Sequence, residues 1–336
     1  MVSRWRLALL VLASLLVLAA ATAAVRREPG PDYVLKAAAV ATAVKAQAAV
    51  GDRLIGPEYS EITTTLGPYA AKQLSRHPDF AAVAVEFILA AGVRPGDRVA
   101  VNLSGSFPAI NIAVLAAIQA VGAEPVVTSS VGASTWGATD PDYTWLDIEQ
   151  TLVARGLWPW QSAAASVGGV GDTGGGLAPE GVAAARAAIR RAGVAELRAR
   201  DLDEAIALRL AAYRQDGQLP AALVNVGGSH VIFGPRGHGA PQALTAGYRP
   251  QRLVAEGLAA PFVQANRPVI HFLNIGRLAA AHGIRSSNPP GTSDVMYART
   301  VPAAARLAIA GWLAAAGWVL WYGGRRKEWW RGPCRH

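Results

Sequence analysis

The sequence has few cysteines, histidines and charged residues, and each shortage excludes a class of protein. Its 336 residues include one cysteine, Cys334, so no disulfide within the chain and no cysteine-based zinc site can form. The six histidines show no HExxH or comparable spacing, and we expect no metal site. Charged residues make up 16% of the chain and hydrophobic residues 52%. This hydrophobic share is high for a soluble protein and favours the presence of membrane segments.

Nucleotide-binding motifs are also lacking. The stretch GVGDTGGG at residues 169–176 is not followed by the Lys-Ser/Thr of a Walker loop. It does not follow a convincing strand either, as a dinucleotide-binding fingerprint would. We interpret it as a flexible loop and expect no cofactor.

Two long apolar runs stand near the ends of the chain. The run from Leu7 to Val25 has nineteen residues without a charge, close to the roughly 20 that span a bilayer. The alternative is a signal peptide, because Arg4 and Arg6 precede the run and Ala-Thr-Ala near its end fits a cleavage site. The second run, Ala303–Tyr322, ends in an aromatic cluster typical of a membrane interface. The alternative for this run is a buried core helix.

Basic residues indicate the orientation of these segments. Lys and Arg cluster after residue 324, which by the positive-inside rule predicts a cytoplasmic C-terminus and an extracytoplasmic main domain. Although the formal net charge is +9, residues 29–300 hold 22 basic and 21 acidic residues, so the excess belongs to the membrane flanks. We therefore expect no nucleic-acid partner, and any acidic ligand must be bound locally. The predicted parts are an anchor or signal peptide (1–27), an extracytoplasmic domain (28–300), a transmembrane helix (301–324) and a basic tail (325–336).

Strands and helices alternate through the central region. RVAVNLSG from Arg98 predicts a buried strand, AINIAVLAAIQAVGA from Ala109 a helix ended by Gly122, and EPVVTSSVG from Glu124 the next strand. Further strands are predicted at Ala222–Val226 and Val269–Asn274. This alternation predicts an α/β fold with a doubly wound, mainly parallel sheet and flanking helices.

Four of the predicted strand ends carry small polar residues. Ligands of open α/β sheets bind beyond the carboxyl ends of the strands, so these ends could converge on one crevice and bind a carboxylate or phosphate. The alternative is that Ser and Gly merely form tight corners there. The predicted ligand-binding residues are Ser104, Gly105, Ser106, Asn111, Ser129, Ser130, Gly227, Gly228, Ser229 and Asn274.

Nucleophilic catalysis has weaker candidates. Ser106 lacks the outer glycines of the G-x-S-x-G elbow, which argues against a typical hydrolase serine. Thr64, in the run Thr63–Thr65, is a second candidate nucleophile, and His230 and His271 are available as bases. The sequence contains no complete catalytic motif.

Several blocks resemble a known family. GPEYSEITTTLG at 56–67, NLSGSFPAINIAVLAA at 102–117, TSSVGASTWGATDPDYTWLD at 128–147 and GGSHVIFG at 227–234 look like blocks of the bacterial poly-gamma-glutamate system protein family. The resemblance implies association with the membrane machinery that makes, exports or anchors poly-γ-glutamate. It implies no particular catalytic residue.

Three functions are compatible with these observations. The first is a membrane-anchored accessory protein of the bacterial cytoplasmic membrane, whose extracytoplasmic domain binds poly-γ-glutamate or a glutamyl intermediate. The candidate counter-charges for the carboxylates of the bound polymer are Arg236, Arg267 and Arg277. The second is a γ-glutamyl hydrolase or transferase, and the third is a scaffold for the synthase and export subunits. The expected partners are thus the polymer, membrane lipid and those subunits.

Overall fold

The computed structural model describes residues 11–17, 19–20, 25–215, 217–235, 247–248, 256–300 and 302–328. The chain divides into two compact units. The larger comprises Pro31–Met296, and the smaller combines Met1–Gly30 with Tyr297–His336.

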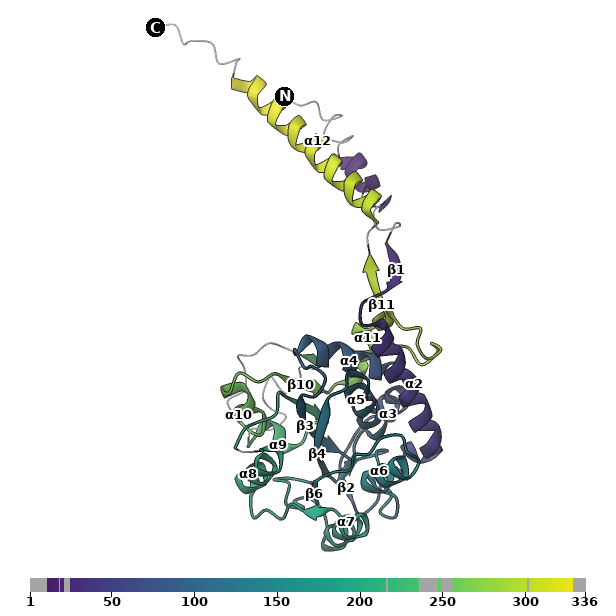
Figure 1. Ribbon diagram of the computed structural model, residues 1–336, viewed down its shortest axis with the longest axis vertical. Helices are drawn as coiled ribbons and strands as arrows, with labels where there is room; N and C mark the ends of the chain where they lie inside the picture. The colour runs from purple at the N-terminus through teal and green to yellow at the C-terminus, as the bar shows by residue number, and fades with distance from the viewer. Residues whose placement is uncertain are drawn as a thin grey trace, which may run out of the picture. The chain divides into compact units, whose positions relative to one another are not determined.

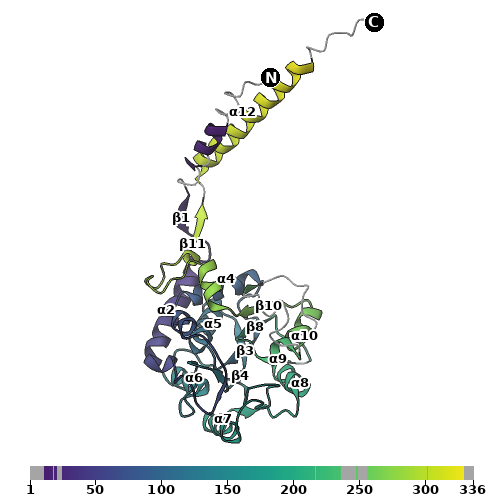
Figure 2. The same ribbon diagram turned by 180° about the vertical axis from the view of Figure 1, so that it is seen from behind.

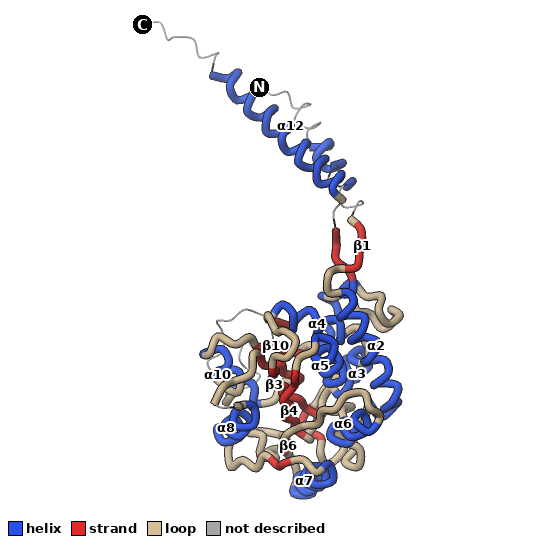
Figure 3. The backbone as a smooth tube through the Cα atoms, in the orientation of Figure 1, coloured by secondary structure: helices blue, strands red, loops and turns tan. Residues whose placement is uncertain are grey.

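A seven-stranded sheet forms the centre of the larger unit, in the order β7-β6-β4-β3-β8-β10-β9. Strand β9 pairs antiparallel with β10, and the other neighbouring strands pair in parallel. The strands lie between helices in Figures 1 and 3. The predicted α/β class, with a mainly parallel sheet and flanking helices, is confirmed.

The predicted strands and the predicted helix from Ala109 recur with close boundaries. The sheet strands are β3 (Arg98–Ser104), β4 (Glu124–Ser130), β6 (Ala164–Ser166), β7 (Ala195–Glu196), β8 (Ala222–Val226), β9 (Gly247–Tyr248) and β10 (Val269–Phe272). A small parallel pair is formed by β2 (Thr63–Thr65) and β5 (Ala133–Ser134). The helices are α2 (Tyr33–Val50), α3 (Tyr69–Ser75), α4 (Phe80–Ala90), α5 (Pro108–Val121), α6 (Trp145–Ala154), α7 (Pro179–Ala192), α8 (Leu202–Tyr213), α9 (His230–Phe233), α10 (Ala259–Gln264) and α11 (Ile275–Ala281), with short 3₁₀ turns at Gly51–Leu54 and Asp294–Met296.

Helices cover both faces of the sheet. Because side chains alternate along a strand, Ala100 and Leu223, which are register partners, point to the same face. There they join a buried cluster with residues of α8, α9 and α10. On the other face Phe272 packs its ring 5.9 Å from that of Phe87 in α4. Figure 2 shows the same layers from behind.

The β3–α5–β4 unit follows directly from its sequence. Strand β3 is buried from Val99 to Ser104, as a central parallel strand must be. Helix α5 begins at Pro108, where a missing N–H costs nothing, and ends at Gly122 in the left-handed conformation. These local signals explain why sequence patterns located this unit well.

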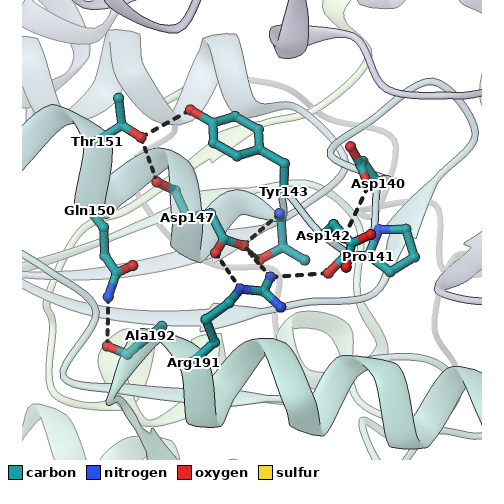
Figure 4. Close-up of polar contacts among 10 residues, drawn as sticks. Asp140, Pro141, Asp142, Tyr143, Asp147, Gln150, Thr151, Arg191 and Ala192 are labelled. Atoms are coloured by element: carbon teal, nitrogen blue, oxygen red, sulfur yellow. Dashed lines mark hydrogen bonds and ion pairs between the residues drawn. The ribbon is translucent and has the colours of Figure 1, made fainter.

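An ion pair joins α6 to α7 (Figure 4). Asp147 closes a capping box with Thr144 at the start of α6. Its two carboxylate oxygens each accept a 2.7 Å hydrogen bond from Arg191 of α7. Arg191 also donates to the carbonyl of Pro141. One aspartate therefore caps one helix and binds the next.

The smaller unit contains a two-stranded ribbon and apolar helical segments. Strand β1 (Arg26–Pro29) pairs antiparallel with β11 (Tyr297–Thr300), so the N-terminal and C-terminal segments of this unit run side by side. Residues 11–17 are helical, and α12 spans Ala303–Glu328. Large apolar side chains of both segments are exposed, among them Leu16 and Leu307.

The helix that best fits a membrane span differs from the two predicted ones. Among the described residues, the helical stretch Tyr33–Leu54 is long and apolar enough to cross a membrane. It begins with α2, which packs on α4 and α5. The predicted span Leu7–Val25 lies partly outside the described residues. Within α12, the described apolar stretch Ala303–Trp318 is shorter than the length required. The two bracketing membrane helices therefore stay a prediction.

Candidate functional site

A cavity of about 690 Å³ opens at the carboxyl ends of β3, β4, β8 and β10. Parallel strands bring their carboxyl ends to one edge of the sheet, and loops from both sides complete the wall. Seven hydroxyl side chains line this cavity: Thr64, Thr65, Ser104, Ser106, Ser130, Ser134 and Ser229. The four polar strand ends noted in the sequence thus meet at one site.

The Ser104-Gly105-Ser106 turn forms one wall. The Ser104 hydroxyl lies 3.4 Å from the Val226 carbonyl and from the Ser106 amide nitrogen. Gly105 does not line the cavity. Its backbone binds the segment after β4, and an added Cβ would lie 2.7 Å from the carbonyl oxygen of Val131. The glycine is therefore required for close approach of two backbones.

Two other predicted residues lie behind the wall. Asn111 is fully buried and donates through Nδ2 to the Ser104 carbonyl at 2.9 Å, which holds the turn on α5. Ser129 points to the opposite face of the sheet, where its hydroxyl lies 2.7 Å from that of Ser162. Period-two alternation places Ser130, and not Ser129, on the cavity side.

The remaining predicted ligand residues lie on the cavity. Gly227, Gly228, Ser229 and Asn274 all line it. Gly227 has φ +93° and passes so close to β3 that a Cβ would lie 2.6 Å from the Ser104 hydroxyl.

The candidate catalytic residues line the same cavity, and no described hydrogen bond joins them into a triad. Thr64 lines the cavity and donates to the Ala133 carbonyl at 3.2 Å. His230 also lines it, with Nδ1 3.5 Å from the Gly171 amide nitrogen. The Ser106 hydroxyl accepts a 3.0 Å hydrogen bond from the Ser134 amide and has no hydrogen bond to a base among the described residues.

The predicted counter-charges are not part of the described wall. Arg267 and Arg277 are exposed and do not line the cavity. Arg236 lies outside the described residues.

Sequence reasoning missed Lys72, on α3. Its side chain is 2% exposed, and its ammonium nitrogen lies 2.6 Å from the Ser134 hydroxyl and contacts the Ser106 carbonyl. The nitrogen also lies 3.9 Å from the centre of the Phe107 ring. Burial lowers the pKa of Lys72 from 10.5 to about 7. No carboxylate among the described residues lies within 4.0 Å of it.

A second missed feature is the buried pair Asp172 and Arg209. The glycine-rich loop, predicted to be only a flexible connection, brings Asp172 to the cavity wall. Arg209 of α8 is 1% exposed and pairs with that carboxylate, and Ser166 binds both partners at 2.8 Å. Asn102 of β3 accepts from Arg209 at 3.2 Å. The carboxylate at the wall is therefore neutralised and fixed in place.

These two features had little signal in the sequence. Lys72 is one lysine of a short helix, and Asp172 stands alone among glycines. Their roles come from partners on other elements, more than 30 residues away along the chain. Within the described part of the chain, no group of three or more His, Cys, Asp or Glu side chains is arranged to hold a metal ion.

The fold and this cavity define a mixed α/β protein with a cavity, lined in part by hydroxyl side chains, at the carboxyl edge of its sheet. No family model matches the chain, and a comparison with curated proteins finds no match. Among solved structures, the chain is similar to the CurK enoyl reductase at 12% sequence identity and a TM-score of 0.22, and to an archaeal alanine:glyoxylate aminotransferase at 12% and 0.17. Each match covers 74% of this chain and 51% of the other, so the chain spans about half the length of those proteins. Scores this low carry no argument about function.

Proposed function

We propose that this protein is a membrane-anchored accessory component of a bacterial poly-γ-glutamate synthesis or export system, and that its cavity binds the polymer or a glutamyl intermediate. The observation that carries the proposal is a cavity with seven hydroxyl side chains in its lining, in which Asp172, the one carboxylate of the described lining, is paired with Arg209. A carboxylate ligand therefore meets hydroxyl donors without meeting an unpaired negative charge.

The polymer matches this chemistry. A γ-linked chain keeps a free α-carboxylate on every residue and an amide between residues. Hydroxyls of Ser130 and Ser229 at the wall are suited to the carboxylates. The pathway itself comes from the sequence resemblance, and the near-neutral charge of residues 29–300 requires that binding be local.

Features of the smaller unit support anchoring. Leu307, Leu313, Trp318 and Trp321 of α12 are 55–72% exposed, as expected of side chains that face lipid. Strands β1 and β11 pair antiparallel, so the apolar segment before β1 and the apolar helix after β11 extend from the same end of this ribbon. We place both termini in the cytoplasm and the α/β unit outside, following the basic residues after residue 324.

Binding is tested with a pair of variants at Gly276. This glycine lines the cavity, and a Cβ added there has no described neighbour within 4 Å. Gly276→Glu introduces a carboxylate, and Gly276→Gln is its neutral control of equal size. Isothermal titration of the full-length chain in detergent with poly-γ-glutamate should give affinities about tenfold weaker for Glu than for Gln, because like charges repel across the cavity.

Two results would contradict the proposal. Equal affinities of the Glu and Gln variants would place the binding site elsewhere. No binding by the unmodified chain would favour the scaffold function. Orientation is tested separately with a membrane-impermeant maleimide, which should label Cys334 only after the cells are permeabilised.

A further inference from the structure

The cavity contains a serine hydroxyl backed by a buried amine. Ser134 lines the cavity and is 6% exposed, and Lys72 lies behind it with its ammonium nitrogen 2.6 Å from the Ser134 hydroxyl. The hydroxyl belongs to β5 and the amine to α3, two elements of the same compact unit. The serine is thus between the base and the space that a ligand would fill.

The surroundings of Lys72 favour a neutral amine. Its described neighbours are the Ser134 hydroxyl, the Ser106 carbonyl and the Phe107 ring. None of them is an anion, and burial without an anion disfavours the charged form. Because the pKa falls to about 7, a large fraction of Lys72 is unprotonated near neutral pH. A lysine whose only role was to hydrogen-bond α3 to the Ser104-Gly105-Ser106 turn would not need to be unprotonated.

The neighbouring backbone leaves room for a substrate at Ser134. A Cβ added at Gly67, which lines the cavity, would lie 3.2 Å from the Ser134 hydroxyl and 3.3 Å from Cε of Lys72. Glycine therefore keeps the space next to the hydroxyl open. The Ser134 amide donates to the Ser106 hydroxyl at 3.0 Å. The Ser106 hydroxyl proton has no acceptor among the described residues, so Ser106 can donate it to a substrate oxygen.

We propose that Ser134 is the nucleophile and Lys72 the general base of an acyl-transfer site, and that the substrate is a secondary amide bearing carboxylates, such as a γ-glutamyl linkage. The proposal rests on the proposed function for the identity of the amide. Ser106 and Thr64 are not assigned as nucleophile, because neither hydroxyl has a hydrogen bond to a base among the described residues. Serine with a lysine base is a known variant of nucleophilic catalysis.

The chemistry balances within these two residues and the substrate. Neutral Lys72 takes the hydroxyl proton while the Ser134 oxygen bonds to the amide carbon, and the carbonyl electron pair moves to its oxygen. When that pair returns, the C–N bond breaks, and the leaving amine takes the proton from the Lys72 ammonium. A serine ester remains. Water gives a proton to Lys72 and attacks the ester, the Ser134 oxygen leaves with that proton, and a carboxylic acid is released. An amine acceptor in place of water gives transfer.

The experiment uses the full-length chain in detergent with two probes. Poly-γ-glutamate is followed for binding by titration and for chain length by size-exclusion chromatography with light scattering. p-Nitrophenyl acetate, an activated ester without carboxylates, is followed for p-nitrophenol release and for acetylation mapped by peptide mass spectrometry. We expect shortening or transfer of the polymer, and acetylation at Ser134.

Variants with matched controls assign the roles. Ser134→Ala should lower the rate at least about 1,000-fold, and Lys72→Met about 100- to 10,000-fold, with polymer affinity within about threefold of the unmodified chain. Ser129→Ala, on the opposite face of the sheet, and Lys45→Met, at an exposed site of α2, should keep their rates within about twofold. Mapping the acetyl group on the unmodified chain keeps the test decisive where a variant misfolds.

The outcomes separate this inference from the proposed function. Polymer binding without shortening, transfer or acetylation of Ser134 overturns the Ser134–Lys72 assignment and leaves the binding function standing. Acetylation of Ser134 without polymer binding supports the pair and overturns the polymer as ligand. Acetylation at another serine, with full activity in Ser134→Ala, also overturns the assignment.

Discussion

Two buried titratable side chains on opposite faces of the sheet give the free energy of unfolding opposite dependences on pH. Glu149 of α6 is 1% exposed and accepts hydrogen bonds from Trp145 and Ser162. Burial dominates these bonds and raises the pKa of Glu149 from 4.5 to about 7. His271 of β10 is 9% exposed, its Nδ1 has no described partner, and burial lowers its pKa from 6.5 to about 4.

The sign of each contribution follows from which state binds the proton. Between pH 4.5 and 7 the folded chain keeps the Glu149 proton and the unfolded chain releases it, so stability falls as pH rises. Between pH 4 and 6.5 the unfolded chain protonates His271 and the folded chain does not, so stability rises with pH. Each of the two pKa shifts corresponds to about 3 kcal/mol of unfolding free energy, at about 1.36 kcal/mol for each pKa unit. In the unmodified chain the two contributions largely cancel.

Single substitutions separate them. The perturbations are Glu149→Gln and His271→Phe, and the assay is urea unfolding of the full-length chain from pH 4 to 8, followed by tryptophan fluorescence. The unfolding free energy of the unmodified chain minus that of Glu149→Gln should fall by about 3 kcal/mol between pH 4.5 and 7. The same difference for His271→Phe should rise by about 3 kcal/mol between pH 4 and 6.5. Subtracting the unfolding free energies removes the contributions of the titratable groups that all three chains share.

One result would refute the reasoning about Glu149. If its variant and the unmodified chain stay parallel from pH 4 to 8, the three hydrogen-bond donors offset burial and the carboxyl titrates alike in the folded and unfolded chain. Parallel curves for His271→Phe would mean that the imidazole has a proton acceptor in the folded chain.

Substitutions at three places test the packing and ion pairs of the fold. Gly105→Ala should cost about 1–3 kcal/mol in urea unfolding, because its Cβ meets a backbone carbonyl at 2.7 Å; a neutral effect would contradict the close approach. Arg209→Met should cost about 3–5 kcal/mol at pH 7 by stranding the buried Asp172 carboxylate, and adding Asp172→Leu should restore part of that loss in the same assay. Asp147→Asn should cost about 1–2 kcal/mol in thermal unfolding, a modest value because the Arg191 side chain is 37% exposed, and Arg191→Met should add little to it.

The core of the fold was predictable from local patterns. Strands β3, β4 and β8 begin and end within a residue or two of the predicted bounds, because buried parallel strands are continuous apolar runs between turn residues. Helices α7 and α8 begin at similar local signals, with Pro179 at the first position of α7 and Asp201 as the N-cap of α8. The short strands β6 and β7 carry too few residues to show a period.

The candidate site was predictable only in part. Strand ends such as Ser104 and Gly227 were identifiable because any parallel sheet gathers its carboxyl ends at one edge. Which of Ser129 and Ser130 faces that edge depended on the register of β4, where a shift of one residue exchanges the faces.

The sequence by itself determined the α/β class, the positions of the main strands along the chain and the presence of small polar groups at their ends. Those features depend on neighbours within a few residues. Only the tertiary structure brought Lys72 to Ser134 and Arg209 to Asp172, because hydrogen bonds and burial join residues 62 and 37 positions apart. The same burial sets the charge of Lys72, a property that no local pattern of residues contains.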